Sequence, residues 1–217
     1  MLISDSHEFI FLQMRKVAST SMQSILRPLC IPRPAGGMAR LKSRARLEWD
    51  YHKYVFRTHD DILAAKRRMP AEKFARYFKF AFVRNPWERL VSEYEYILRQ
   101  AGHGRHARVS RLDNFSEFIR MQIPRRDAYQ INMLCDKKGR LLVDFVGKLE
   151  DLQNDWQTAC VRAGIPYQAL PRKNVTQYRN FRDFYDQDCI LLVAKHWARE
   201  IEQFGYSFDS VQQESLK

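Results

Sequence analysis

Residues 77–98, which read YFKFAFVRNPWERLVSEYEYIL, decide the fold. The apolar run at 77–83 is rich in aromatic residues and predicts a buried strand. Pro86 then stands at the first position of a helix, where its missing N–H costs nothing. From Trp87 onward, apolar side chains recur every three or four residues, which is typical of an amphipathic helix. The sequence therefore predicts a strand that runs directly into a helix.

The rest of the chain repeats this alternation of strands and helices. Short apolar runs predict further strands at 9–14, 54–57 and 141–146, and apolar periodicity predicts further helices at 19–29, 60–69, 152–163 and 190–204. Alternating strands and helices imply an α/β fold in which helices flank a central, mainly parallel sheet. With 217 residues, the chain is long enough for one sizeable core and short for two, so we expect a single domain over residues 1–217.

Two stretches concentrate the net charge of +12. Residues 27–46 hold six basic residues and no acidic ones, and residues 99–126 hold seven basic residues against two acidic ones. Within the second stretch, the polar and aperiodic segment 102–113 predicts a mobile loop near the ligand site. Such charge attracts nucleotides, acidic polysaccharides, nucleic acids and membrane surfaces, and charge alone does not choose among them.

The sequence carries no sign of a membrane span or a signal peptide. No run of apolar residues is long enough to cross a bilayer, and no N-terminal basic region precedes an apolar stretch. We therefore expect a cytoplasmic protein, with peripheral membrane contact left open. The four cysteines include no CxxC pair, which argues against a zinc site.

The residues after the strand at 9–14 form a candidate anion site. They are Arg15, Lys16, Val17, Ala18, Ser19, Thr20 and Ser21. The N–H groups in the first turn of a helix lack intrahelical acceptors, and the helix dipole favours negative charge there. Three hydroxyl groups and Lys16 add donors. The segment has no glycine and is not a Walker A loop, so an ordinary Ser/Thr cap remains the alternative interpretation.

A second candidate anion site follows the strand at 77–83. Arg84 ends that strand, and Ser92 lies eight residues later, about two turns into the helix. A planar guanidinium binds phosphate oxygens in pairs, so Arg84 and Ser92 are candidates for binding one phosphate. The alternative role for Arg84 is a structural ion pair. We expect Arg89 either to face solvent or to pair with a neighbouring glutamate. Both candidate sites follow strands of the predicted parallel sheet, where ligands commonly bind.

The two candidate sites resemble motifs of sulfotransferases that use 3′-phosphoadenosine 5′-phosphosulfate (PAPS). KVASTSM at 16–22 resembles the 5′-phosphosulfate loop of the carbohydrate-modifying branch, and FKFAFVRNPWERLVSEY at 78–94 resembles the 3′-phosphate motif RxPxxRxxSxY. Similarity continues at 141–156 and 170–208. The resemblance implies a P-loop-like three-layer fold, PAPS as the donor, 3′-phosphoadenosine 5′-phosphate (PAP) as the product, and no metal.

The resemblance also implies roles for individual residues. Lys16 contacts the oxygen that bridges phosphorus and sulfur, and Ser19–Ser21 hold the 5′-phosphate. Arg84 and Ser92 hold the 3′-phosphate. The chain lacks the C-terminal glycine-and-lysine motif of the cytosolic branch, so its contacts to the adenine and to the rest of the 3′-phosphate are unassigned. Arg172 and Lys173 are candidate substitutes.

Sulfuryl transfer also needs a base that removes the proton of the acceptor hydroxyl. FRTH at 56–59 resembles the KTH element that carries the base in cytosolic sulfotransferases, which makes His59 the first candidate. His52 is the second, because some polysaccharide-acting relatives use a histidine pair on a comparable segment. Glu48 is the third, because other branches use a glutamate soon after the first helix.

The expected acceptor is a carbohydrate or glycolipid, and the basic stretches favour an anionic one. A P-loop-type nucleotide kinase is an alternative enzyme, but GK[ST] and a Mg²⁺-binding carboxylate after a strand are missing. A basic nucleic-acid-binding module is the other alternative, and the charge permits it although no motif supports it. We therefore expect no nucleic-acid partner, and the sequence does not indicate an oligomeric state.

Overall fold

The computed structural model describes residues 1–32, 36–45, 48, 50–171 and 180–209. The chain divides into two compact units. Unit 1 comprises Met1–Val83 and Asn132–Lys173, and unit 2 comprises Arg84–Ile131 and Asn174–Lys217. The chain therefore first crosses from unit 1 to unit 2 at the peptide bond after Val83. This bond lies at the junction of strand and helix that the sequence predicts.

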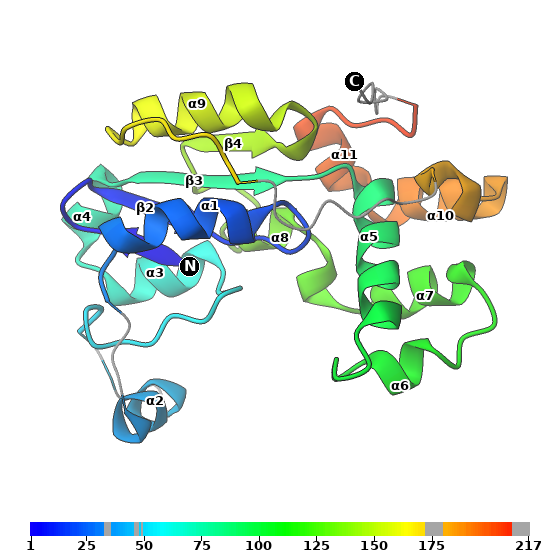
Figure 1. Ribbon diagram of the computed structural model, residues 1–217, viewed down its shortest axis with the longest axis horizontal. Helices are drawn as coiled ribbons and strands as arrows, with labels where there is room; N and C mark the ends of the chain where they lie inside the picture. The colour runs from blue at the N-terminus through cyan, green and yellow to red at the C-terminus, as the bar shows by residue number, and fades with distance from the viewer. Residues whose placement is uncertain (33–35, 46–47, 49, 172–179, 210–217) are drawn as a thin grey trace. The chain divides into compact units, whose positions relative to one another are not determined.

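Unit 1 is built on a four-stranded sheet in the order β1-β2-β3-β4 (Figure 1). The strands are β1 Leu2–Ser4, β2 Phe9–Leu12, β3 Phe78–Val83 and β4 Phe145–Lys148. β1 pairs with β2 in antiparallel orientation, whereas β2, β3 and β4 run parallel. The predicted α/β fold with a mainly parallel sheet is confirmed, and the carboxyl ends of β2, β3 and β4 lie at the same edge of the sheet.

Helices lie on both faces of this sheet. Those of unit 1 are α1 Ser19–Leu26, α2 Gly37–Arg44, α3 Ile62–Arg68, α4 Ala71–Arg76 and α9 Leu152–Arg162, with 3₁₀ turns at Arg27–Leu29 and Leu149–Asp151. Figure 1 shows α9 on one side of the strands and α3 and α4 on the other. On the α4 side, Lys79 Nζ donates to the carbonyl oxygens of Phe74 and Tyr77 at 3.2 and 2.6 Å, where it neutralises the end of α4.

Aromatic side chains fill the face of the sheet that α9 covers. All of β2 and all but the first residue of β3 are buried, as in a parallel strand covered on both sides. The ring centroids of Phe11 and Phe80 lie 5.1 Å apart, and those of Phe82 and Trp156 lie 6.5 Å apart. Gly147 of β4 leaves room for the Phe82 ring, because a Cβ at that position would come within 2.5 Å of it.

Unit 2 is helical. Its elements are α5 Pro86–Arg99, α6 His106–Val109, α7 Phe115–Gln122, α10 Gln187–His196 and α11 Ala198–Phe204, with 3₁₀ turns at Arg126–Ala128 and Phe181–Phe184. α8 Ile131–Leu134 begins in unit 2 and ends in unit 1. α5 begins with Pro86, and the Asn85 side chain caps it by accepting from Trp87 N at 3.0 Å. The predicted run of strand into helix is thus confirmed.

Several predicted boundaries were wrong. Residues 54–57 form no strand, because hydrogen bonds within turns use their backbone groups: Tyr54 N donates to Asp50 O, and Arg57 N donates to the Asp60 carboxylate. The last predicted helix is two helices, α10 and α11, which meet at Trp197. The segment 102–113, predicted as a loop, contains the short helix α6.

The fourth strand begins later than the sequence predicts. Cys135 and Leu141 instead form an antiparallel bridge that closes a turn at 136–139. β4 follows at Phe145–Lys148. Of the helices in the described ranges, none is long and apolar enough to cross a membrane.

Candidate active site

The loop between β2 and α1 has an unusual backbone. Lys16 and Ala18 both have positive φ values, 63° and 55°, although neither is a glycine. A Cβ atom disfavours this conformation by about 1–2 kcal/mol, and such outliers cluster at ligand sites. Left-handed residues within a turn direct successive N–H groups into a concavity that suits an anion. Because the loop contains no glycine, this feature could not be predicted from the residue types.

Two of the three hydroxyl groups at the start of α1 hold this loop in place. Ser19 Oγ donates to the Met14 carbonyl oxygen at 2.7 Å, and Ser21 Oγ donates to the Pro171 carbonyl oxygen at 2.8 Å. Thr20 is exposed. Ala18, at the N-cap position, makes no side-chain capping bond, and the first turn of α1 contains no acidic residue. An anion at this helix end would therefore meet N–H groups, Lys16 and the Thr20 hydroxyl.

His59 is held at the same strand end. Its Nδ1 lies 2.8 Å from the carbonyl oxygen of Gln13, the first residue after β2. A carbonyl oxygen only accepts, so Nδ1 must carry the proton of this bond. The neutral ring then has its lone pair on Nε2. The structure thus fixes the tautomer that a general base needs, on an exposed histidine beside the loop that begins at Arg15.

His52, the second candidate base, is engaged differently. Its Nε2 lies 2.7 Å from Asp5 Oδ2, and its Nδ1 lies 3.0 Å from Asp50 Oδ1. Both ring nitrogens of His52 therefore face carboxylate oxygens, so this ring is held within a cluster of acidic residues and not at the end of β2 as His59 is. Glu48, the third candidate, accepts from Asp50 N at 3.1 Å.

Asp5 is the centre of a polar cluster that contains His52. Its carboxylate accepts from the hydroxyls of Tyr77 and Tyr51, and Lys73 Nζ lies 3.6 Å away. Burial disfavours the charge of Asp5, but hydrogen bonds from Tyr77, Tyr51 and His52 outweigh it and lower the pKa of Asp5. Burial and the bond to Asp5 raise the pKa of Tyr51 to about 12. These groups stabilise one another, which is typical of a structural cluster.

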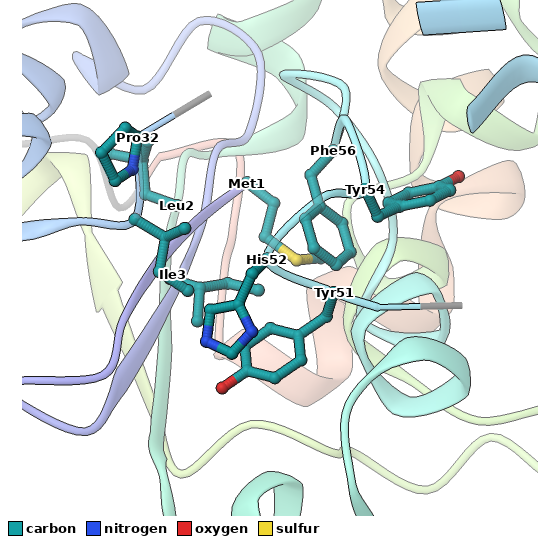
Figure 2. A pocket seen from close by; sticks show the side chains of 9 residues that line it. Met1, Leu2, Ile3, Pro32, Tyr51, His52, Tyr54 and Phe56 are labelled. Atoms are coloured by element: carbon teal, nitrogen blue, oxygen red, sulfur yellow. The ribbon is translucent and has the colours of Figure 1, made fainter. Parts of the chain in front are cut away.

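A small pocket of unit 1 adjoins this cluster. Figure 2 shows its lining, which is mainly apolar and includes Tyr51 and His52. Its cavity volume of about 30 Å³ has room for a water molecule but not for a sugar ring. The pocket therefore offers no acceptor site in this conformation.

The second predicted anion site begins in unit 2 with Arg84. Its guanidinium is 9% exposed and pairs with Glu88 one turn along α5. Its main chain is bonded to the amide of Gln130: Arg84 N donates to Gln130 Oε1 at 2.9 Å, and Gln130 Nε2 donates to Arg84 O at 2.8 Å. The ion pair that was the alternative for Arg84 is thus present. Glu88 holds the guanidinium of Arg84, and Gln130 holds its main chain.

The two other polar residues of this motif are buried on α5. Ser92 is 2% exposed. Arg89 is also buried; it donates to the carbonyl oxygen of Ala128 and lies 3.5 Å from Glu93 Oε2. Of the two alternatives for Arg89, the neighbouring glutamate is the one that the structure shows.

The chain matches the family model described as "Sulfotransferase family" over residues 1–207. It belongs to the sulfotransferase family. The chain is 25% identical over 208 residues to carbohydrate sulfotransferase 14 of Danio rerio, an alignment that covers 82% of the chain and 52% of that relative. It thus spans about half the length of this relative.

A second relative is an uncharacterised protein of Archaeoglobus fulgidus, 29% identical over 119 residues that cover 54% of the chain and 92% of that protein. No solved structure matches the chain significantly. Membership of the sulfotransferase family implies a P-loop-like fold, which agrees with the parallel sheet and the loop between β2 and α1.

The basic stretch at 99–126 is partly neutralised. Arg99 pairs with Glu95, Arg105 with Glu93, and Arg125 with Asp127. Besides the paired Arg99, four arginines of the stretch are exposed: Arg108, Arg111, Arg120 and Arg126. The candidate adenine contacts, Arg172 and Lys173, lie outside the described residues, as do two basic residues of the stretch at 27–46. Within the described residues, no group of three His, Cys, Asp or Glu side chains is placed to hold a metal ion.

Proposed function

We propose that this protein transfers a sulfuryl group from PAPS to a hydroxyl group of a carbohydrate or glycolipid. The observation that carries the proposal is the loop after β2, in which Lys16 and Ala18 take left-handed conformations at an uncapped helix end beside His59. The family of the chain supports sulfuryl transfer, and the name of the Danio rerio relative supports a carbohydrate acceptor.

The proposed binding mode assigns one end of the donor to each anion site. The backbone N–H groups at the start of α1, with Lys16 and Thr20, bind the 5′-phosphosulfate. Arg84 and Ser92 bind the 3′-phosphate. Arg84 suits this role because a guanidinium binds phosphate oxygens in pairs, and its rigid attachment to Gln130 and Glu88 limits the entropy lost on binding.

In the proposed mechanism, His59 Nε2 removes the proton of the acceptor hydroxyl. The hydroxyl oxygen then forms a bond to sulfur while the bond between sulfur and the bridging oxygen breaks, and PAP leaves with that oxygen. Lys16 and the N–H groups of the loop stabilise the negative charge that develops on the departing phosphate, and because they are fixed beforehand they need little reorganisation. Holding donor and acceptor in line supplies the rest of the acceleration.

The acceptor is proposed to be anionic. Arg108, Arg111 and Arg120 are exposed in unit 2, and exposed arginines attract carboxylated or sulfated sugars. Transfer of ³⁵S from labelled PAPS to uronic-acid oligosaccharides, neutral oligosaccharides and glycolipids tests the proposal. Labelling of the uronic-acid oligosaccharides above the others is expected, whereas labelling of none of the three classes would refute the carbohydrate acceptor.

A further inference from the structure

We propose that Glu200 of α11 is a positioning residue for Arg84 and acts through Gln130. The inference rests on the proposed role of Arg84 in binding the 3′-phosphate. It assigns a function to a buried carboxylate that is 116 positions from Arg84 in the sequence and that no motif indicates.

Gln130 determines the course of the main chain at Arg84. Its amide oxygen accepts from Arg84 N at 2.9 Å, and its amide nitrogen donates to Arg84 O at 2.8 Å. Arg84 is the first residue after β3, so no neighbouring strand supplies these partners. A buried amide that donates and accepts at one residue therefore replaces the missing ladder bonds.

Glu200 in turn determines the position of Gln130. Glu200 is fully buried, and its Oε2 accepts from Gln130 N at 2.6 Å and from Ile131 N at 3.3 Å. Its Oε1 lies 3.3 Å from Gln130 Nε2, the atom that also donates to Arg84 O. The carboxylate therefore holds both the main chain and the amide group of Gln130, and it allows only the amide orientation that suits Arg84.

The burial of Glu200 makes a purely stabilising role a weak explanation. Burial raises the pKa of Glu200, and the charge of Arg89 and the bonds from Ile131 and Gln130 oppose that rise. Buried charges are often no more stabilising than apolar residues of similar size, whereas they do fix one geometry. The geometry fixed here is that of Arg84, because Gln130 connects the two residues directly.

Affinity for PAP and AMP, which differ by the 3′-phosphate, tests the inference. The variants are Glu200→Gln and Gln130→Met, and the control is Glu202→Gln, the same substitution at an exposed position of the same helix. Isothermal titration should show PAP affinity about tenfold lower in both variants, the equivalent of about one hydrogen bond. AMP affinity and the control should match the wild type.

The outcomes separate the inference from the proposed function. Equal binding of PAP and AMP by the wild-type protein would refute both. A wild type that prefers PAP, together with variants that keep the full preference, would refute the positioning role alone. A variant that only loses stability lowers the folded fraction and leaves the ratio of the two affinities unchanged, which also counts against positioning. If Glu200→Gln does not fold, Gln130→Met decides the question, because it keeps Glu200.

Discussion

Two substitutions of His59 separate its proposed role as general base from its hydrogen bond to Gln13. His59→Asn keeps a donor near the Gln13 carbonyl oxygen but provides no base, whereas His59→Ala removes both. Loss of a general base lowers kcat by about 10²- to 10⁴-fold, which corresponds to about 3–5 kcal/mol of barrier height. Loss of the bond to Gln13 adds about 1 kcal/mol of destabilisation in His59→Ala only. We therefore expect His59→Asn and His59→Ala to lose kcat equally. Only His59→Ala should have a lower melting temperature.

Initial rates of ³⁵S transfer, with PAP affinity and melting temperature measured on the same samples, distinguish these effects. PAP affinity should stay within about twofold of the wild type, because His59 is proposed to contact the acceptor and not the nucleotide. His52→Asn is the matched control, and its kcat should be unchanged because both nitrogens of His52 already bind carboxylates. Wild-type kcat in His59→Asn, or a large loss in His52→Asn, would refute the assignment of the base.

Three further predictions concern stability. Ala18→Gly should leave the free energy of unfolding unchanged or raise it by up to about 1 kcal/mol, whereas Ala18→Val should lower it, because φ is 55° there; equal effects in chemical denaturation would contradict the strain. Gly147→Ala should cost about 1–3 kcal/mol, since its Cβ would meet the buried Phe82 ring, and an unchanged melting temperature would show that the strands can shift. Asp5→Asn should destabilise at neutral pH by about 1–3 kcal/mol. Because the pKa of Asp5 is lowered in the folded state, the difference in free energy of unfolding between wild type and Asp5→Asn should shrink as the pH falls below about 4. A difference independent of pH would contradict the lowered pKa.

The parts of the fold that local patterns determine were predictable. Residues 77–98 carry their own signals, because a buried aromatic run and a proline at the first helical position need no partner to be recognised. The same reliance on local pattern made the predicted strand at 54–57 wrong. The β-forming composition of these residues does not show that their N–H groups bond to Asp50 and Asp60. β1, at Leu2–Ser4, is too short to show a period.

Site features that depend on tertiary contacts could not be predicted from the sequence. Arg84 stood out because it follows a strand, but its partner Gln130 is 46 residues away and has no distinctive neighbours. The tautomer of His59 depends on the carbonyl group of Gln13, a backbone atom that any residue would supply. The left-handed Ala18 is an exception to the usual preference for glycine, which composition alone cannot indicate.

The central claim is that the two junctions bind the two phosphate-bearing ends of PAPS. Isothermal titration of the full chain with PAP, and with AMP and ATP as controls, tests it most directly. We predict micromolar binding of PAP that weakens strongly in AMP, because AMP has no 3′-phosphate for Arg84 and Ser92. Absence of PAP binding, or binding of ATP as tight as that of PAP, would contradict the claim.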